Sequence, residues 1–178
     1  MSEDFSPERY DGVARFLHWL TVLLLVTQFA IAWTMPEIGR GTRPLGLIAW
    51  HLSIGTAILT VILVRAVWRF THREPPAPTT LSPTMQFIAR ATHVTLYALL
   101  IALPLLGWAN SSARGWDVIL FGLIKLPGLV SLGSPVGRAL GDVHQTVALV
   151  LLAVIALHVL GALYHFLVAK DRTLQRIV

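Results

Sequence analysis

The chain of 178 residues has no cysteine, which excludes disulfide bonds, cysteine-ligated zinc, iron–sulfur clusters, covalently attached c-type haem and a cysteine nucleophile. Charged residues are also scarce, at 13%, whereas a soluble domain carries about 25%. Hydrophobic residues make up 55%, and the mean hydropathy is +0.69. Because a disordered chain needs the opposite balance and a soluble enzyme needs more charge, the composition indicates a membrane protein.

Acidic residues are few as well, nine against fourteen Lys and Arg, and the net charge is +5. A basic balance of this kind can indicate a nucleic-acid partner. Here, however, the basic residues lie at the ends of apolar runs and do not form one patch. We therefore expect membrane lipid, and no nucleic acid, among the partners.

Four windows without any charged residue divide the chain, at 16–36, 44–64, 91–113 and 143–169. Each meets the roughly 20 residues that a ~30 Å hydrocarbon core requires. Within lipid the backbone must satisfy its own hydrogen bonds, so these windows are predicted to be helices. We expect one domain over residues 1–178, an all-α integral membrane four-helix bundle. Its spans are predicted at about 14–36, 44–70, 84–109 and 139–169.

The connection 110–138 is the longest between the predicted spans, and its apolar piece is interrupted by Lys125, Pro127 and Gly128. It is too short and too broken to cross a membrane, so it is predicted to be an interfacial segment that covers one mouth of the bundle. Within the third span, Pro104 with Gly107 predicts a kink or the end of the helix.

The distribution of Lys and Arg predicts the orientation. Nine of them lie on the side that holds both termini, and five lie on the side that holds 110–138. Because cytoplasmic loops carry the excess of positive charge, both termini are expected in the cytoplasm.

Six of the seven histidines lie within or at the edge of a predicted span: His18, His51, His93, His144, His158 and His165. Ionisable residues in membrane spans are costly and mark functional sites by default. Neutral imidazole is a common metal ligand. With no cysteine and almost no carboxylate in the spans, haem iron suits this composition better than an oxygen-ligated ion does.

Depth in the membrane predicts how these histidines pair. His51 and His144 both lie near the outward start of a span. His158 follows His144 by fourteen residues, which is about 21 Å along a helix and returns to within about 40° of the same face. His18 lies at that inner depth, so two stacked sites are predicted, one outer and one inner. Spacing alone does not choose the inner pair from this set: His18, His93, His158 and His165.

The chain resembles the bacterial cytochrome b561 family in RFLHWL, AWHLSIGTAILTVILVRAVWRF, ATHVTLYALLIALPLLGW, DVHQTVALVLLAVIALH and YHFLVAKDRTLQRI. The resemblance runs from about residue 10 to residue 177. It implies two haem b groups with bis-histidine ligation, one bound by His18 and His158 and the other by His51 and His144. It also implies a multi-pass protein of the bacterial inner membrane.

The function that the resemblance implies is electron transfer between an outer-side donor, either superoxide or a periplasmic redox protein, and the membrane quinone. Its concrete form is a superoxide:ubiquinone oxidoreductase, with ubiquinone as the electron acceptor. One alternative is the cytochrome b electron-transfer subunit of a hydrogenase or formate dehydrogenase complex. Another is a metal or proton transporter, which would use the same histidines without haem.

Two further residues are candidates for the site. Arg65, deeper in the second span than Arg69, is predicted either to bind a propionate of the inner haem or to anchor the span. His165 lies about 10 Å closer to the cytoplasm than His158 along one helix. It is predicted to meet a quinone head group or a propionate, or to be an interfacial histidine with a hydrogen-bonded partner.

Overall fold

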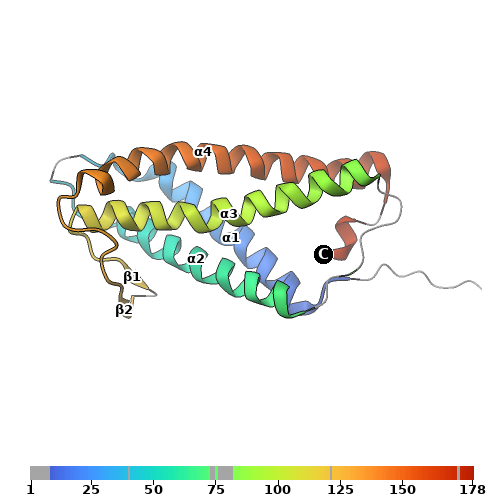
Figure 1. The fold of residues 1–178 in the computed structure, drawn as a ribbon, viewed down its shortest axis with the longest axis horizontal. Helices are drawn as coiled ribbons and strands as arrows, with labels where there is room; N and C mark the ends of the chain where they lie inside the picture. The colour runs from blue at the N-terminus through green and yellow to red at the C-terminus, as the bar shows by residue number, and fades with distance from the viewer. Residues whose placement is uncertain (1–8, 40, 73–74, 76–81, 121, 172) are drawn as a thin grey trace, which may run out of the picture.

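The computed structural model describes residues 9–39, 41–72, 75, 82–120, 122–171 and 173–178. The long helices of the described residues are α1 (Gly12–Thr34), α2 (Leu47–Thr71), α3 (Pro83–Ala113) and α4 (Pro135–Tyr164), and their arrangement is seen in Figure 1. One π-helical turn, η1 (His165–Ala169), prolongs α4, and a short 3₁₀ turn, η2 (Leu174–Arg176), follows it. All four helices are long and apolar enough to cross a membrane. The prediction of an all-α membrane four-helix bundle is confirmed.

Side-chain caps determine where three of the helices begin. Asp11, Ser82 and Ser134 each precede a helix, and the side chain of each accepts a hydrogen bond from a backbone N–H of the first turn. These residue types are favoured at that position because they satisfy a donor that the helix leaves free. Pro83 and Pro135 follow two of the caps in the first helical turn, where a missing N–H costs nothing.

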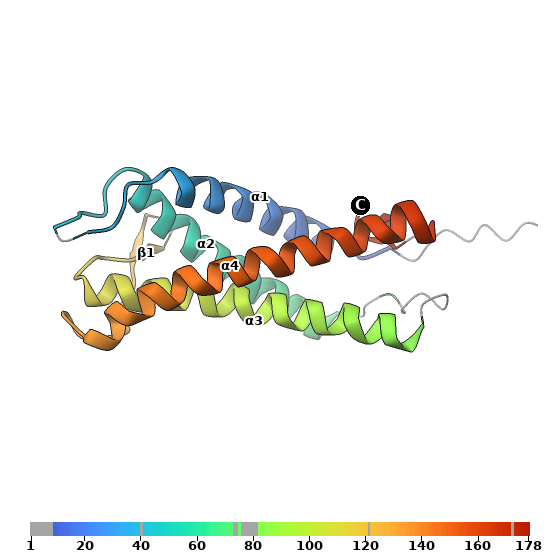
Figure 2. The same cartoon turned by 90° about the horizontal axis from the view of Figure 1, so that it is seen from above.

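The bundle consists of two pairs of consecutive antiparallel helices, α1 with α2 and α3 with α4. Within the described residues the helices are closely packed inside each pair, and α2 also packs against α3. The core at mid-depth contains Ile58, Ile62, Leu100 and Leu151. Figure 2 shows α4 running obliquely to α3, and neither α1 nor α2 is closely packed along it. Helix α4 therefore contacts α1 and α2 through side chains, without close approach of the backbones.

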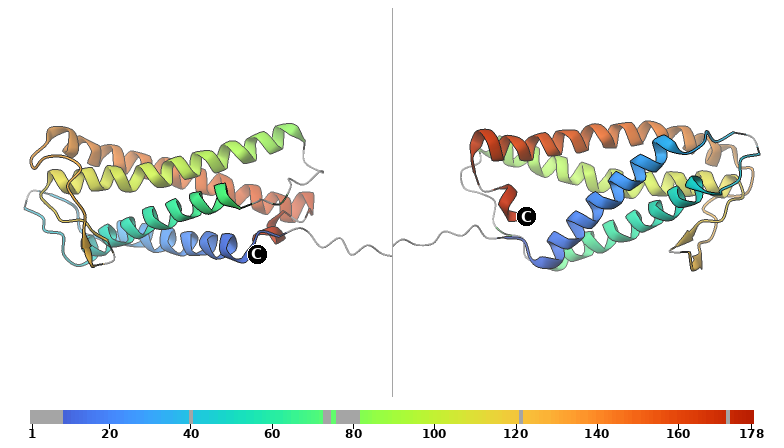
Figure 3. Two further views of the ribbon diagram at one scale, coloured as in Figure 1. Left: turned by 60° about the horizontal axis from the view of Figure 1, so that its bottom comes forward. Right: turned by 180° about the vertical axis from the view of Figure 1, so that it is seen from behind.

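The two ends of the bundle differ. At one end, which we call the hairpin end, the strands β1 (Ile119–Leu120) and β2 (Ile124–Lys125) pair antiparallel beside α2. At the other, the tail end, the chain turns back after η1 and lies against the start of α1 (Figure 3). There the N–H of Tyr10 donates to the Arg176 carbonyl at 3.0 Å, and the indole of Trp19 donates to the Ile177 carbonyl at 3.0 Å.

Helix α3 does not end at Pro104, so that part of the prediction is wrong. The helix continues to Ala113 and ends at the hairpin end. A proline inside a helix removes one backbone donor, but packing against α4 holds the segment in helical form. The segment around Pro104 also contributes to a site, because the carbonyl of Leu103 accepts a hydrogen bond from a side chain of α4.

Candidate functional site

His51 of α2 and His144 of α4 form a pair near the hairpin end, across helices that are not closely packed. Their ring centroids are 6.1 Å apart and the planes are inclined by 72°. Nδ1 of His144 is 2.9 Å from the carbonyl of Leu103 and donates its proton to it. Since the proton is on Nδ1, the lone pair of His144 is on Nε2, the tautomer that a metal ligand needs.

A glycine on α3 makes room for this ring. A Cβ added at Gly107 would lie 3.1 Å from Cε1 and 3.2 Å from Nδ1 of His144. Carbon atoms prefer about 3.5–4.0 Å, so a side chain at this position would push the ring away. Gly107 therefore helps to set where the imidazole of His144 lies.

His51 is contacted by Gln28, a polar residue in the middle of α1. The amide nitrogen of Gln28 donates to the His51 carbonyl at 3.0 Å and is 3.3 Å from Nε2 of the ring. Nδ1 of His51 and Oε1 of Gln28 are buried and have no hydrogen-bond partner. Gln28 was not among the site residues predicted from the sequence, although a polar side chain inside an apolar span is a signal that could have identified it.

His18 of α1 and His158 of α4 form a second pair nearer the tail end, again across helices that are not closely packed. Their centroids are 6.4 Å apart, with an inclination of 65°. His93 of α3 is also close, with its centroid 5.2 Å from that of His158, and its Nδ1 donates to the Ala89 carbonyl at 2.8 Å. The structure thus brings together three of the four inner histidines that spacing left open.

The spacing of both pairs matches that of two imidazoles on opposite sides of one metal atom. A metal–imidazole bond is about 2 Å long, and the ring centroid is about 1.1 Å behind the nitrogen, so the expected separation is roughly 6.2 Å. The pairs at 6.1 Å and 6.4 Å meet this value, whereas the 5.2 Å between His93 and His158 is too short. In the described residues no group of three or more His, Asp or Glu could hold a metal by itself. Isolated pairs suit a metal whose other ligands come from a macrocycle.

Orphaned polar atoms also fit the haem that the sequence predicted. Among the described residues, the buried side-chain atoms without a partner belong to Arg15, Gln28, His51 and Thr173. His51 is a member of the hairpin-end pair, Gln28 contacts it, and Arg15 is three residues before His18. Buried polar atoms are normally satisfied, so these positions suit a large group that carries polar substituents of its own.

Arg65 lies at the tail-end pair, where one guanidinium nitrogen is 3.0 Å from Nδ1 of His18. The same guanidinium lies 5.6 Å from the ring centroid of Tyr97, and Arg69 is 5.9 Å from that centroid. Arginine only donates, so Nδ1 of His18 accepts in this arrangement. The predicted propionate role of Arg65 stays a prediction.

His165 lies apart from both pairs, in η1 at the tail end. Its Nδ1 is 2.6 Å from a carboxylate oxygen of Asp171, and each side chain is only 14% exposed. Asp171 was not among the site residues predicted from the sequence, although it lies six residues after His165, just past the last predicted span.

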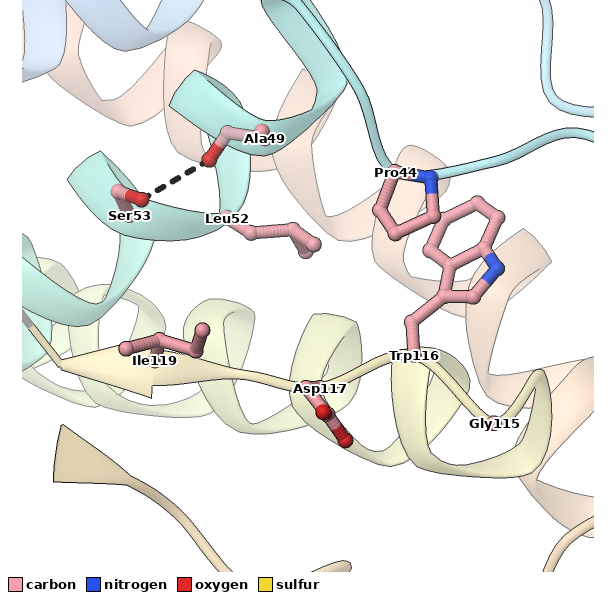
Figure 4. A pocket seen from close by; sticks show the side chains of 8 residues that line it. All are labelled: Pro44, Ala49, Leu52, Ser53, Gly115, Trp116, Asp117 and Ile119. Carbon is pink, nitrogen blue, oxygen red and sulfur yellow. Dashed lines mark hydrogen bonds between the residues drawn. The ribbon is translucent and has the colours of Figure 1, made fainter. Parts of the chain in front are cut away.

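A cavity of about 330 Å³ opens at the hairpin end (Figure 4). It lies between the first turns of α2 and the segment that leads from α3 into β1, and Leu52, Ser53 and Trp116 are part of its lining. Leu52 and Ser53 directly follow His51 on α2, but neither histidine of the pair lines the cavity.

Comparisons with known proteins agree over nearly the whole chain. A family model described as prokaryotic cytochrome b561 matches residues 9–178. The chain is 34% identical to the probable superoxide oxidase CybB of Yersinia pestis, over 96% of each chain. It is 28% identical to cytochrome b561 homolog 2 of Escherichia coli K12, over 100% of this chain and 95% of that protein. It is also 28% identical to cytochrome b561 homolog 1 of the same organism, over 96% and 97%.

Proposed function

Because the chain belongs to the prokaryotic cytochrome b561 family, whose members are electron-transfer membrane cytochromes with b-type haem, we propose that it carries electrons across the bilayer between two haems. His51 and His144 would hold the haem at the hairpin end, and His18 and His158 the haem at the tail end. The observation that carries this proposal is the spacing of 6.1 Å and 6.4 Å within the two pairs. When bound, the haems supply one-electron transfer.

The residues around the ligands have roles of their own in this proposal. The carbonyl of Leu103 holds the proton of His144 on Nδ1 and leaves Nε2 for iron. At the tail end, His18 would hold iron through Nε2 with a proton on Nδ1, and Arg65 would then no longer donate to that Nδ1. The released guanidinium is then free to pair with a haem propionate, which a planar fork of donors suits.

The orientation follows from the basic residues. Along the sequence, nine of the fourteen Lys and Arg flank the predicted spans on the side of both termini, and five lie on the side of the connection 110–138. We infer that the tail end, with both termini, faces the cytoplasm of a bacterial cell and that the hairpin end faces the periplasm across the inner membrane. The cavity at the hairpin end would then open toward an outer-side donor.

The specific reaction that we propose is superoxide:ubiquinone oxidoreduction. Two superoxide ions, one quinone and two protons become two molecules of oxygen and one quinol. With two histidines holding each iron, the haems would offer no free position to oxygen, which would favour electron transfer over oxygen activation. Support also comes from the 34% identical relative, which is named a probable superoxide oxidase.

The experiment is a reduced-minus-oxidised spectrum of the detergent-purified protein, with haem quantified per chain. Two low-spin b haems per chain are expected, reducible by superoxide and reoxidised by ubiquinone. Fewer than two haems would refute the dihaem assignment. Two haems that superoxide does not reduce, in a preparation with a stoichiometric periplasmic protein, would instead identify a subunit of a hydrogenase or formate dehydrogenase type of complex. Well-folded protein without haem would favour a transporter.

A further inference from the structure

Gln28 places its amide group beside the candidate haem ligand His51 without being a ligand itself. The amide nitrogen donates to the carbonyl of His51 at 3.0 Å and lies 3.3 Å from Nε2 of the same imidazole. Polar side chains inside membrane spans are costly, and those that are present mark functional sites by default. One side chain of α1 thus contacts both the backbone and the ring of one histidine of α2.

The orientation of this amide is fixed by the group that it faces. A carbonyl oxygen only accepts hydrogen bonds, so the nitrogen end of the Gln28 amide, and not its oxygen end, has to lie opposite the His51 carbonyl. The oxygen end, Oε1, is buried and has no partner in the described part of the chain. The positive end of the amide dipole therefore lies beside Nε2 of His51.

A glycine on α2 makes room for the amide. Gly55 lies one turn after His51, and a Cβ added there would be 3.4 Å from the amide nitrogen of Gln28. Helices α1 and α2 are closely packed, so the amide rests on the α2 backbone near Gly55 and the carbonyl of His51. The bond to the carbonyl does not involve the ring and is therefore compatible with a metal on Nε2.

His51 differs in its contacts from His144, its partner in the hairpin-end pair. Nδ1 of His144 donates to the carbonyl of Leu103 at 2.9 Å, the usual kind of contact that orients a metal-ligating histidine and makes it more basic. Nδ1 of His51 is buried and has no acceptor among the described residues. Gln28 approaches the ring at its other nitrogen and so supplies a restraint that the usual contact does not.

The same contact acts on the charge of a metal bound at this position. A metal held by Nε2 of His51 is about 2 Å from that nitrogen, and hence no more than about 5.3 Å from the amide nitrogen of Gln28. Ferric haem carries one more positive charge than ferrous haem, so the positive end of a dipole nearby favours the ferrous form. Inside the span the dielectric constant is low, and this effect is screened far less than in water.

We propose that Gln28 is a positioning residue for the haem at the hairpin end: it restrains the imidazole of His51 and raises the reduction potential of that haem. This proposal rests on the proposed function, in which His51 and His144 hold the haem. A higher potential at the hairpin end makes this haem a better electron acceptor for an outer-side donor.

The test is an anaerobic potentiometric titration of the purified holoprotein, followed by its visible spectrum. Gln28→Met removes the amide and keeps an unbranched side chain of similar length, and Gln28→Leu is a second apolar variant. Thr27→Val is the matched control, because Thr27 is the neighbouring polar residue of α1 and its hydroxyl donates to the Leu23 carbonyl of the same helix. The titrations are repeated in a His158→Ala background, which should keep only the hairpin-end haem.

We expect the midpoint potential of the hairpin-end haem to fall in Gln28→Met and Gln28→Leu and to keep the parent value in Thr27→Val. A contact of hydrogen-bond strength changes an equilibrium constant by about tenfold, which corresponds to a shift of about 59 mV for one electron. The tail-end haem should keep its parent potential in all three variants. The electron paramagnetic resonance signal of the ferric hairpin-end haem should also change in the two Gln28 variants, because it depends on the orientation of the axial imidazoles.

These readouts separate tuning of the haem from a simple bridge between helices. If both Gln28 variants lower the melting temperature or the haem content while the bound haem keeps its parent potential, Gln28 only joins α1 to α2 and the proposal is overturned. Equal shifts of both haems, or loss of the hairpin-end haem from both variants, would overturn it too. If the parent protein itself binds no haem at the hairpin end, the proposed function fails, and this proposal fails with it.

Discussion

A single methyl group at Gly107 is expected to weaken the binding of the haem that we propose at the hairpin end. A Cβ at this position would lie 3.1 Å from Cε1 of His144, whereas carbon atoms prefer about 3.5–4.0 Å. The ring of His144 then has to retreat from α3 by about 0.3 Å. Because Leu103 is on the same helix as Gly107, the retreat lengthens the 2.9 Å hydrogen bond to the Leu103 carbonyl to as much as about 3.2 Å, the usual limit.

The size of the effect follows from that hydrogen bond. Its full loss would cost about 0.5–1.5 kcal/mol, so the stretched bond lowers the affinity for the hairpin-end haem by at most about two- to twelvefold. The bond also makes the imidazole a better electron donor, so its weakening should raise the reduction potential of that haem. The same substitution should stabilise helix α3, because alanine is favoured over glycine in a helix by about 1 kcal/mol. A loss of haem is therefore not expected to come from unfolding.

The measurement is a haem titration and a potentiometric titration of Gly107→Ala, with the tail-end haem as the internal reference. Gly161→Ala is the matched control for the hairpin-end haem. It is another helical glycine, at the opposite depth, and apart from its chain neighbours and the nearby backbone of α4 itself no described atom lies within 4 Å of a Cβ added there. If Gly107→Ala keeps the parent affinity and the parent potential at the hairpin-end haem, the contact with His144 does not position that ligand and the argument is wrong.

Three other predictions concern the two histidine pairs, His93 and Asp11. His144→Ala should lose only the hairpin-end haem and His158→Ala only the tail-end haem, as judged by haem per chain and low-temperature spectra. His93→Ala should keep both haems, because its centroid is too close to His158 for an iron between them, and loss of one would make it a ligand. Hydrogen bonds from the Ala14 N–H and the Trp68 indole lower the pKa of Asp11 below 3.8 in the folded protein. The stability that these bonds contribute is therefore complete above pH 3.8 and is lost as the pH falls through the lower pKa of the folded state. Tryptophan fluorescence should show a transition in that acidic range in the parent protein and none in Asp11→Asn.

The fold was predictable because its causes are local. Four charge-free windows of sufficient length determine four membrane helices, whatever they pack against. The two-residue strands of the hairpin were not predictable, because so short a pair depends on contacts with α2 and α3, such as the bond from the Trp108 indole to the Pro127 carbonyl. Of the two outcomes predicted at Pro104, a kink or the end of the helix, only the end is excluded, because α3 continues to Ala113 and packs against α4.

The candidate ligands could be paired from sequence to the extent that helix periodicity allows. A spacing of fourteen residues puts His144 and His158 on one face of α4, and the structure places a histidine of another helix opposite each. The choice between His18 and His93 needed the geometry across helices, which depends on how α1 and α3 are rotated. The contacts of Gln28 with His51 and of Arg65 with His18 depend on the same rotation, so no pattern within one helix indicated them.

The docking of the C-terminal tail on α1 affects how the orientation of this protein can be mapped in cells. The indole of Trp19 donates to the carbonyl of Ile177, and the ring of Trp19 lies 5.4 Å from that of His18. A reporter enzyme fused after Val178 would start one residue beyond that hydrogen bond and would disturb the neighbourhood of His18. Single cysteines labelled from either side of intact cells avoid this problem, because the native chain has no thiol background. Leu123, 86% exposed at the hairpin end, and His72, exposed at the tail end, are suitable positions for them.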